Sequence, residues 1–295
     1  MEIKVQQNVS LRHLCTYRVG GPAKFFAEAR TMTEMIGLKA FAKEQKVPFL
    51  LLGAGSNVLF SDEGYPGLII HNKMEGIQIN GDTVNAEGGV NLMKLILVCA
   101  QNNLGGISGL ANVPGTVGGA VYGNAGIPDI WIGNILLQAV LLPEKSLKPK
   151  MVGPEYFEFG YRTSKIKGTK DIVLSATLRL KPEPQAKIRA DINEYIKQRA
   201  LKQPSGNSCG SFFKNPKEFP SAGWLIEQAG CKGMTVGGAQ VSPKHANFLM
   251  NTGIATSKDI VELAVQVYQK VKDKFNVELE PEVQIYPTSP FAKTE

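Results

Sequence analysis

The chain has 295 residues, of which 43% are hydrophobic and 20% charged, a composition typical of globular proteins of about two domains. No apolar run reaches the ~18–20 residues that a membrane-spanning helix needs. The N-terminal stretch MEIKVQQ also lacks the apolar core of a signal peptide. We therefore expect a cytoplasmic protein, neither secreted nor embedded in a membrane.

The net charge of +7 has two interpretations: affinity for nucleic acid or a small polyanion such as a nucleotide, or a solubilising surface. No block of five Lys or Arg residues and no basic stripe with aromatics occurs, so nucleic acid is the weaker interpretation. The four cysteines, Cys15, Cys99, Cys209 and Cys231, form no C-x-x-C motif and no zinc-spaced cluster. We expect no disulfide framework and no metal site. Three cysteines are expected to be buried, and Cys209 lies in a polar loop.

The first 180 residues predict strands and helices in alternation, punctuated by Gly and Asn. A helix is expected near residues 33–46. Asn91 can cap a second helix, with Leu92, Leu95, Ile96 and Cys99 on one face, which Gly105-Gly106 would end. A glycine-rich segment extends from there to Gly126. The expected strands are 24–29, 48–52, 67–71, 77–79, 83–87, 135–142 and 171–180.

The composition changes at Lys181-Pro182-Glu183-Pro184, where two prolines interrupt both helix and strand pairing and predict a linker. A helix is expected at 185–199. Thr256-Ser257-Lys258-Asp259 resembles a capping box, and a core-facing apolar stripe at helical spacing follows it. The class is α+β, with a boundary near residues 181–185.

Three glycine clusters precede this boundary, at residues 18–23, 52–57 and 114–120. Glycine lets backbone N–H groups converge on an anion, and Ser or Thr adds a hydroxyl donor. Each cluster alone is compatible with an ordinary turn. The cluster at 52–57 is not a Rossmann fingerprint, because it lacks the third glycine and a convincing following helix, and it is not a P-loop, because G-K-[ST] is missing. Together they favour a phosphate-bearing ligand, and we expect a nucleotide.

Three polar stretches are candidates for chemistry. Arg162, in Tyr161-Arg162-Thr163-Ser164, can clamp a carboxylate or be a surface arginine. The loop 203–216 (QPSGNSCGSFFKNP) places Ser208, Cys209 and Ser211 where one of them can donate a proton, or it is a turn before a strand. Glu282 follows Pro281 at a strand start, where it can reach a site or be a solvated charge.

His13, His71 and His245 have no partners suggesting a catalytic triad or a metal site, and we expect them to be structural. His245 alone is flanked by other potential ligand donors, in the stretch Lys244-His245-Ala246-Asn247.

The ordered set of motifs resembles one family, the UDP-N-acetylenolpyruvoylglucosamine reductases, which complete UDP-N-acetylmuramate in peptidoglycan synthesis. The matching segments span nearly the whole chain: TYRVGGPA (16–23), LGAGSNVL (52–59), PGTVGG (114–119), Tyr161-Arg162, GSFFKNP (210–216) and LEPEVQ (279–284). The resemblance implies an FAD-binding domain of the vanillyl-alcohol-oxidase-like (PCMH) type at residues 1–182, with subdomains of about 1–70 and 71–182. It also implies a C-terminal α+β substrate-binding domain at 183–295.

The resemblance implies that FAD is held non-covalently, because Gly20-Gly21-Pro22 stands where related oxidases carry a flavin-linking histidine. NADPH would give a hydride to the flavin, which passes it to the enolpyruvyl double bond of UDP-N-acetylglucosamine enolpyruvate. Arg162 and Glu282 match the residues that stabilise the resulting enolate, and Ser211 matches the proton donor. Cys209 is expected to be a neighbour of that donor.

Further site residues follow from the matching motifs. Those expected to bind FAD are Tyr17, Arg18, Gly53, Gly55, Ser56, Asn57, Pro114, Gly115, Thr116, Gly118, Gly119, Asn124 and Ala125. Those expected to bind the sugar nucleotide are Tyr161, Lys214, Asn215 and Lys244.

The chain departs from the family pattern in two places. Only nine residues separate Arg162 from Ile172, which indicates the shorter class without a Tyr-bearing insert. After Asn124-Ala125-Gly126, the segment Ile127–Trp131 differs from the common Ala-Tyr-Gly continuation. We expect a monomer that binds small molecules and neither nucleic acid nor membrane.

Two other functions remain as alternatives. One is a different flavoenzyme on the same fold, such as a small-alcohol oxidase, which would bind FAD, reduce O₂ and ignore NADPH. The other is a nucleotide- or RNA-binding protein without catalysis, which predicts no flavin and an affinity that falls steeply with salt.

Overall fold

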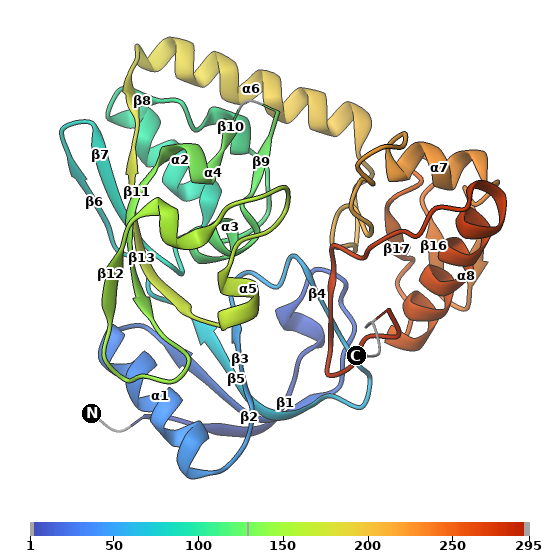
Figure 1. Cartoon of the computed structure of the whole chain (residues 1–295), viewed down its shortest axis with the longest axis horizontal. Coiled ribbons are helices and arrows are strands. Elements are labelled where there is room, and N and C mark those ends of the chain that lie inside the picture. The colour runs from blue at the N-terminus through green and yellow to red at the C-terminus, as the bar shows by residue number, and fades with distance from the viewer. Residues whose placement is uncertain (1–2, 129, 292–295) are drawn as a thin grey trace. The chain divides into compact units, whose positions relative to one another are not determined.

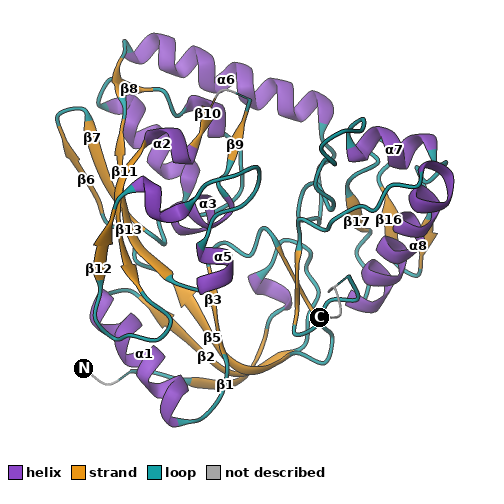
Figure 2. Ribbon diagram, viewed as in Figure 1, coloured by secondary structure: helices purple, strands orange, loops and turns teal. Residues whose placement is uncertain are grey.

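The computed structural model describes residues 3–128 and 130–291, which form two compact units (Figure 1). The first unit holds residues up to Val5, Phe26–Ala54 and Leu68–Arg199, and the second holds Gln6–Phe25, Gly55–Gly67 and the chain from Ala200 onward. Helices and strands mix in both units (Figure 2), which fits the expected α+β class. The expected boundary at 182/183 concerns family domains and stays a prediction.

An antiparallel sheet forms the centre of the first unit. Its strand order is β12-β11-β13-β7-β6, with bounds Lys150–Val152, Leu136–Leu142, Ile172–Arg179, Thr83–Glu87 and Ile77–Asn80. Gly81 takes φ 59° in the turn that joins β6 to β7, a backbone conformation that glycine adopts without strain. Four expected strands are thereby confirmed, each within two residues of its predicted ends.

Helix α2 (Leu92–Gln101) packs the predicted apolar face into the core of this unit, and the Asn91 side chain accepts a hydrogen bond from the Lys94 N–H at 3.1 Å. Its predicted end at Gly105-Gly106 is wrong. The helix stops at Gln101, and Asn103 takes φ 57°. Leu104–Gly105 then forms strand β8, which pairs with β14 (Lys181–Pro182). The expected linker therefore begins with paired strand, because Pro182 lies at the end of a two-residue ladder.

The glycine-rich stretch contains a helix that the sequence did not predict, α3 (Val117–Gly123). Thr116 caps its start, and Asn124 ends it in the left-handed conformation with φ 45°. Short elements follow: β9 (Gly126–Ile127), β10 (Ile130–Trp131), α4 (Ile132–Ile135), the 3₁₀ turn Pro154–Phe157 and α5 (Ile166–Thr169). The expected helix at 185–199 is confirmed as α6 (Gln185–Lys202).

A second sheet has the order β1-β2-β5-β3. Strand β1 (Gln6–Ser10) lies in the second unit, whereas β2 (Pro22–Ala29) and β5 (Tyr65–Asn72) begin there and continue into the first. In the first unit β3 (Phe49–Leu52) runs parallel to β5. Between β2 and β3 the chain forms α1 (Met32–Glu44), which a Thr31–Glu34 capping box begins.

The second unit joins its early segments to its late ones. Strand β4 (Val58–Phe60) pairs in parallel with β18 (Gln284–Tyr286), and β15 (Thr235–Val236), β16 (Ala239–Val241) and β17 (Leu249–Asn251) form an antiparallel sheet. Its helices are α7 (Ala222–Gln228) and α8 (Ser257–Phe275). The predicted capping box of Thr256 and Asp259 is confirmed, and the stripe from Ile260 to Val271 is buried. Over the described residues, no helix is long and apolar enough to cross a membrane.

Candidate active site

The three residues expected to be catalytic lie in different units: Arg162 in the first, and Ser211 and Glu282 in the second. Within the second unit the backbone joins the segments of Ser211 and Glu282. The Glu282 N–H donates to the carbonyl of Phe212 at 2.8 Å, one residue beyond Ser211. Both side chains are half-buried. Two residues that stand 71 positions apart in the chain are therefore held at one place.

The loop at Asn57 meets the same place. The Asn57 Nδ2 donates to the Glu282 carbonyl at 3.1 Å, and the Gln284 N–H donates to the Asn57 carbonyl at 3.1 Å. These bonds continue the parallel pairing of β4 with β18. The expected FAD loop and the backbone of Glu282 are thus parts of one hydrogen-bonded assembly.

Asn247 fixes the loop that carries Ser211. Its side chain accepts from the Phe213 N–H at 2.9 Å and donates from Nδ2 to the Phe213 carbonyl at 2.8 Å, while its own carbonyl accepts from the Phe212 N–H at 2.7 Å. Asn247 is 2% exposed, and Phe212 and Phe213 are equally buried. A two-point bond of this kind holds the backbone of the loop in place.

Replacing Asn247 by Ala should lower the free energy of unfolding by about 2–5 kcal/mol, because it leaves two buried backbone groups of Phe213 without partners. Asn247→Asp keeps the acceptor for the Phe213 N–H but places a second carboxylate oxygen against the Phe213 carbonyl in a buried site, so it should not restore the stability. Urea denaturation of the two variants and the wild type measures the difference. Equal stability of all three proteins would show that the pair does not hold the loop.

The thiol of Cys209 points into the protein. Its Sγ lies 3.2 Å from the Val58 carbonyl and 3.4 Å from the Thr16 hydroxyl, and the residue is 7% exposed. Burial raises the pKa of Cys209 to about 12, so the thiol stays protonated at neutral pH. All four cysteines are buried and free, so the expected burial of the other three is confirmed.

We expect none of the four cysteines to react with a thiol reagent at pH 8 while the protein is folded, and all four to react after unfolding. A colorimetric thiol count with and without denaturant checks this reactivity. Rapid labelling of the folded protein would contradict the burial of the thiols.

Because the pKa of Cys209 is raised on folding, its contribution to stability is complete below about pH 9 and is lost as the pH rises towards 12.

The other expected FAD residues of the second unit differ in exposure. Tyr17 is fully buried, and its carbonyl accepts from the Asn251 Nδ2 at 2.8 Å. Burial raises the pKa of Tyr17 well above its usual range, so its hydroxyl remains neutral.

Arg18 is exposed, has φ 58° and lines a cavity of about 240 Å³. Ser56 is half-buried. At Gly55, which has φ 64°, any Cβ would lie 1.9 Å from the Leu14 carbonyl oxygen.

In the first unit two expected FAD loops approach each other. A Cβ on Gly53 would lie 2.6 Å from the Thr116 hydroxyl, so only glycine allows this contact. The amides at the start of α3 are already engaged: those of Val117 and Gly118 donate to Val90 and Gly88, and that of Gly119 donates to Thr116 Oγ1. Pro114 is exposed, and Gly115 accepts from the Leu92 N–H at 3.1 Å.

Arg162 lies in a tight turn closed by two hydrogen bonds between Gly160 and Thr163. Its φ is 54°, in the left-handed region that costs a non-glycine residue energy. The Asn124 side chain anchors this turn, because its Nδ2 donates to the Gly160 carbonyl at 3.0 Å and its Oδ1 accepts from the Gly133 N–H at 3.1 Å. Asn124 therefore supports the Arg162 turn. The next residue, Ala125, uses its carbonyl to accept a hydrogen bond from the Ile132 N–H at 2.9 Å.

Arg199, near the end of α6, is a candidate that the sequence analysis missed. Burial lowers its pKa, and the nearby charge of Arg162 acts in the same direction. An arginine whose charged form is disfavoured in this way gains from an anionic partner such as a carboxylate. The sequence placed Arg199 at the end of a helix and gave no sign of its proximity to Arg162.

The residues expected to bind the sugar nucleotide make contacts of their own. Tyr161 is 44% exposed. In the second unit the Lys214 ammonium pairs with Glu280, the Asn215 Oδ1 accepts from the Ala222 N–H at 3.0 Å, and the Lys244 Nζ donates to the Ala200 carbonyl at 2.6 Å. The side chains of Lys214, Asn215 and Lys244 therefore contact other residues of the second unit.

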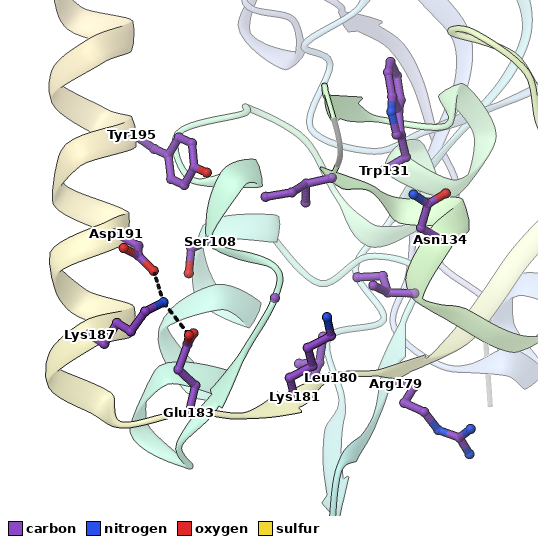
Figure 3. Close-up of a pocket in the computed structure, with 13 residues that line it drawn as sticks. Ser108, Trp131, Asn134, Arg179, Leu180, Lys181, Glu183, Lys187, Asp191 and Tyr195 are labelled. Carbon is purple, nitrogen blue, oxygen red and sulfur yellow. Dashed lines mark hydrogen bonds and ion pairs between the residues drawn. The ribbon is translucent and has the colours of Figure 1, made fainter.

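The first unit also has a cavity of about 490 Å³ beside α6 (Figure 3). Among its lining residues are Trp131, Asn134, Lys181 and Tyr195, none of which the sequence analysis assigned to a site. Lys187, also in its wall, forms ion pairs with Glu183 and Asp191. In the described part of the chain, no group of three His, Cys, Asp or Glu side chains that could hold a metal is found.

Known proteins resemble this chain over nearly its whole length. The family model of the FAD binding domain matches residues 23–130, and that of the UDP-N-acetylenolpyruvoylglucosamine reductase C-terminal domain matches residues 201–286. The reductase of that name from a Synechococcus strain is 39% identical over 96% of this chain and 91% of its own length. The one from Pediococcus pentosaceus is 40% identical over 96% and 95%.

A solved structure agrees with these matches. The crystal structure of the UDP-N-acetylenolpyruvylglucosamine reductase of Thermus caldophilus has a TM-score of 0.82 and 32% identity, and the match covers 97% of this chain and all of that one. The expected α+β fold with a PCMH-type FAD-binding domain and a family-specific C-terminal domain is thereby confirmed. The chain belongs to the UDP-N-acetylenolpyruvoylglucosamine reductase family and is an FAD-dependent oxidoreductase.

Proposed function

We propose that the protein reduces UDP-N-acetylglucosamine enolpyruvate to UDP-N-acetylmuramate in peptidoglycan synthesis, with NADPH as the hydride donor. One observation supports the assigned residues more than any other. The Glu282 N–H bonds to the Phe212 carbonyl at 2.8 Å, which brings the backbone of Glu282 beside the segment that carries the expected proton donor, Ser211. We also propose that it acts as a cytoplasmic monomer, with domains at 1–182 and 183–295.

The loops of the chain fit an FAD. The close approach of Gly53 to the Thr116 hydroxyl brings a glycine-rich loop beside a hydroxyl group that can donate to a phosphate. The amides of Val117, Gly118 and Gly119 are bonded within the protein and are not counted among the donors. We also propose that Gly55, Ser56 and Asn57 bind the cofactor. FAD, when bound, supplies hydride transfer from NADPH to the enolpyruvyl carbon.

The side chains of the protein handle the charge and the proton. Hydride addition creates negative charge on a carbon next to a carboxylate, and Arg162 stabilises that enolate electrostatically. Glu282 acts with Arg162 on the same intermediate. Ser211 gives its hydroxyl proton to the neighbouring carbon and regains one from water, so the net addition is one hydride and one proton. A serine hydroxyl is a weak acid, and it can donate only to a strong base such as this carbanion.

Lys214, Asn215 and Lys244 are proposed to meet the diphosphate, and Tyr161 the sugar nucleotide. In the structure the Lys214 ammonium pairs with Glu280, which is 69% exposed at its side chain. A diphosphate carries more negative charge than one carboxylate, so it can replace Glu280 as the partner of Lys214.

The test of the function is turnover. NADPH oxidation by the purified protein should depend on added UDP-N-acetylglucosamine enolpyruvate. Mass spectrometry should find UDP-N-acetylmuramate, which is two hydrogens heavier than that substrate. Oxidation of an alcohol with O₂ and without NADPH would favour the alternative oxidase. A protein that takes up no FAD and binds RNA with steep salt dependence would favour the non-catalytic alternative.

Gly53→Ala should weaken FAD retention, because the added methyl group would lie 2.6 Å from the Thr116 hydroxyl oxygen. Thr116→Ala, which removes a hydroxyl group proposed to bind FAD and also costs about 1 kcal/mol as a lost helix cap, should weaken retention too. The ratio of flavin to protein absorbance after gel filtration measures retention. Full retention by Gly53→Ala would separate Gly53 from the cofactor site.

A further inference from the structure

The guanidinium group of Arg162 lies beside two aromatic rings in the first unit. Its Cζ is 5.5 Å from the centroid of the Trp131 ring and 5.9 Å from that of Tyr161. The two rings meet edge to face, with centroids 6.1 Å apart and planes at 76°. These distances allow a cation–π attraction between the guanidinium group and the electron-rich faces of the rings.

The indole of Trp131 is itself held in place. Strand β10 pairs Trp131 with Gly126 of β9, and a Cβ on Gly126 would lie 2.5 Å from the indole Cε3 and 2.7 Å from its Cδ2. The ring therefore packs directly on the backbone of Gly126. A side chain in such contact has little freedom to change rotamer, so it offers Arg162 a fixed surface.

The backbone of Arg162 is equally constrained. Its carbonyl accepts from the Lys167 Nζ at 2.7 Å, and the Asn124 side chain holds the Gly160 carbonyl at the start of the turn. These bonds set where the side chain begins. They do not set where the guanidinium group ends. The aromatic pair supplies an attraction that acts on the guanidinium group itself.

We propose that Trp131 is a positioning residue for Arg162: it holds the guanidinium group where it can stabilise the enolate. The inference rests on the proposed role of Arg162 and adds a residue that acts only through it. Electrostatic preorganisation depends on a donor held in a fixed position, so a mobile guanidinium group stabilises the enolate less well. The rate should therefore fall only in the step that builds negative charge.

A double-mutant cycle tests this. Trp131→Leu should slow the reoxidation of the reduced enzyme by the enolpyruvyl substrate roughly 3- to 30-fold, the range expected of a cation–π contact. Reduction by NADPH should change less than about twofold. Trp131→Phe should recover most of the rate, since it keeps an aromatic face. In the Arg162→Met background, Trp131→Leu should have no further effect. An equal slowing by Trp131→Leu in both backgrounds would make Trp131 merely structural and overturn the proposal.

A second readout does not depend on turnover. The chain has two tryptophans, and Trp224 lies in α7 of the second unit at 46% exposure. Trp224→Phe should leave both half-reactions unchanged and leave Trp131 as the sole tryptophan. In that variant Arg162→Met should change the tryptophan emission, and an unchanged emission would overturn the contact. If the emission changes but Arg162→Met leaves reoxidation intact, the proposed role of Arg162 fails while the contact stands, and Trp131 then positions nothing catalytic.

Discussion

Ser211→Ala is expected to slow the reoxidation of the reduced enzyme by UDP-N-acetylglucosamine enolpyruvate by roughly 10²- to 10⁴-fold, the contribution of a general acid. Reduction by NADPH should be nearly intact, because that half-reaction needs no proton from the protein. The loss should be large because the negative charge of the intermediate persists until an acid close to the carbon protonates it. Anaerobic stopped-flow absorption measures the two half-reactions separately.

Ser208→Ala is the matched control for this variant. Ser208 lies in the same loop, is also half-buried and has no assigned role in the reaction. It should leave both rates within about twofold of the wild type, as surface-like changes away from a site usually do. Equal slowing of the two half-reactions by Ser211→Ala would remove Ser211 from the role of proton donor.

Arg162→Met should reduce the rate of reoxidation by roughly 10²- to 10³-fold, the usual loss when one preorganised donor to a developing anion is removed. Methionine matches the length and apolar stem of arginine but carries no charge, so packing against Trp131 and Tyr161 is largely kept. The same stopped-flow experiment reports the loss.

Arg162→Lys keeps the charge without the planar fork and should recover only part of the rate. The dependence of the reductive half-reaction on NADPH concentration should be unaffected in both variants. A change confined to NADPH binding would contradict the enolate-stabilising role.

Local signals in the sequence predicted the regular elements well. Asn91 and the Thr256–Asp259 capping box mark the starts of α2 and α8, because a side-chain oxygen that satisfies the first amides is encoded within four residues. The apolar faces of both helices are visible in the spacing of their residues. The hairpin of β6 and β7 follows in the same way from Asn80-Gly81.

The elements that were missed depend on distant partners. Helix α3 contains Gly118, Gly119 and Gly123, which cost helix stability, and its start is instead secured by hydrogen bonds to Gly88 and Val90. Strand β14 exists because Leu104–Gly105 lies opposite Lys181–Pro182, 77 residues further along the chain. Neither pairing can be inferred from nearby residues.

The prediction of the site was limited in the same way, by contacts between residues that stand far apart in the chain. Sequence patterns alone left Arg162, Ser211 and Glu282 as one interpretation among others, and the family resemblance assigned their roles. The residues that hold the site residues in place were not predicted from the sequence. Asn247 stands 34 residues after the Phe213 that it holds, and Trp131 stands 31 residues before Arg162. Such contacts arise only when the chain folds, because nothing in the local spacing of either residue specifies its partner.

The most direct test of the central claim is the visible absorption spectrum of the purified protein, recorded anaerobically before NADPH, after NADPH, and again after UDP-N-acetylglucosamine enolpyruvate. We expect yellow flavin bands that bleach with NADPH and return with the sugar nucleotide, which establishes both half-reactions in one cuvette. Bands that ignore NADPH would contradict the reductase and favour an oxidase. A colourless protein that fails to take up added FAD would contradict the cofactor and, with it, the proposed function.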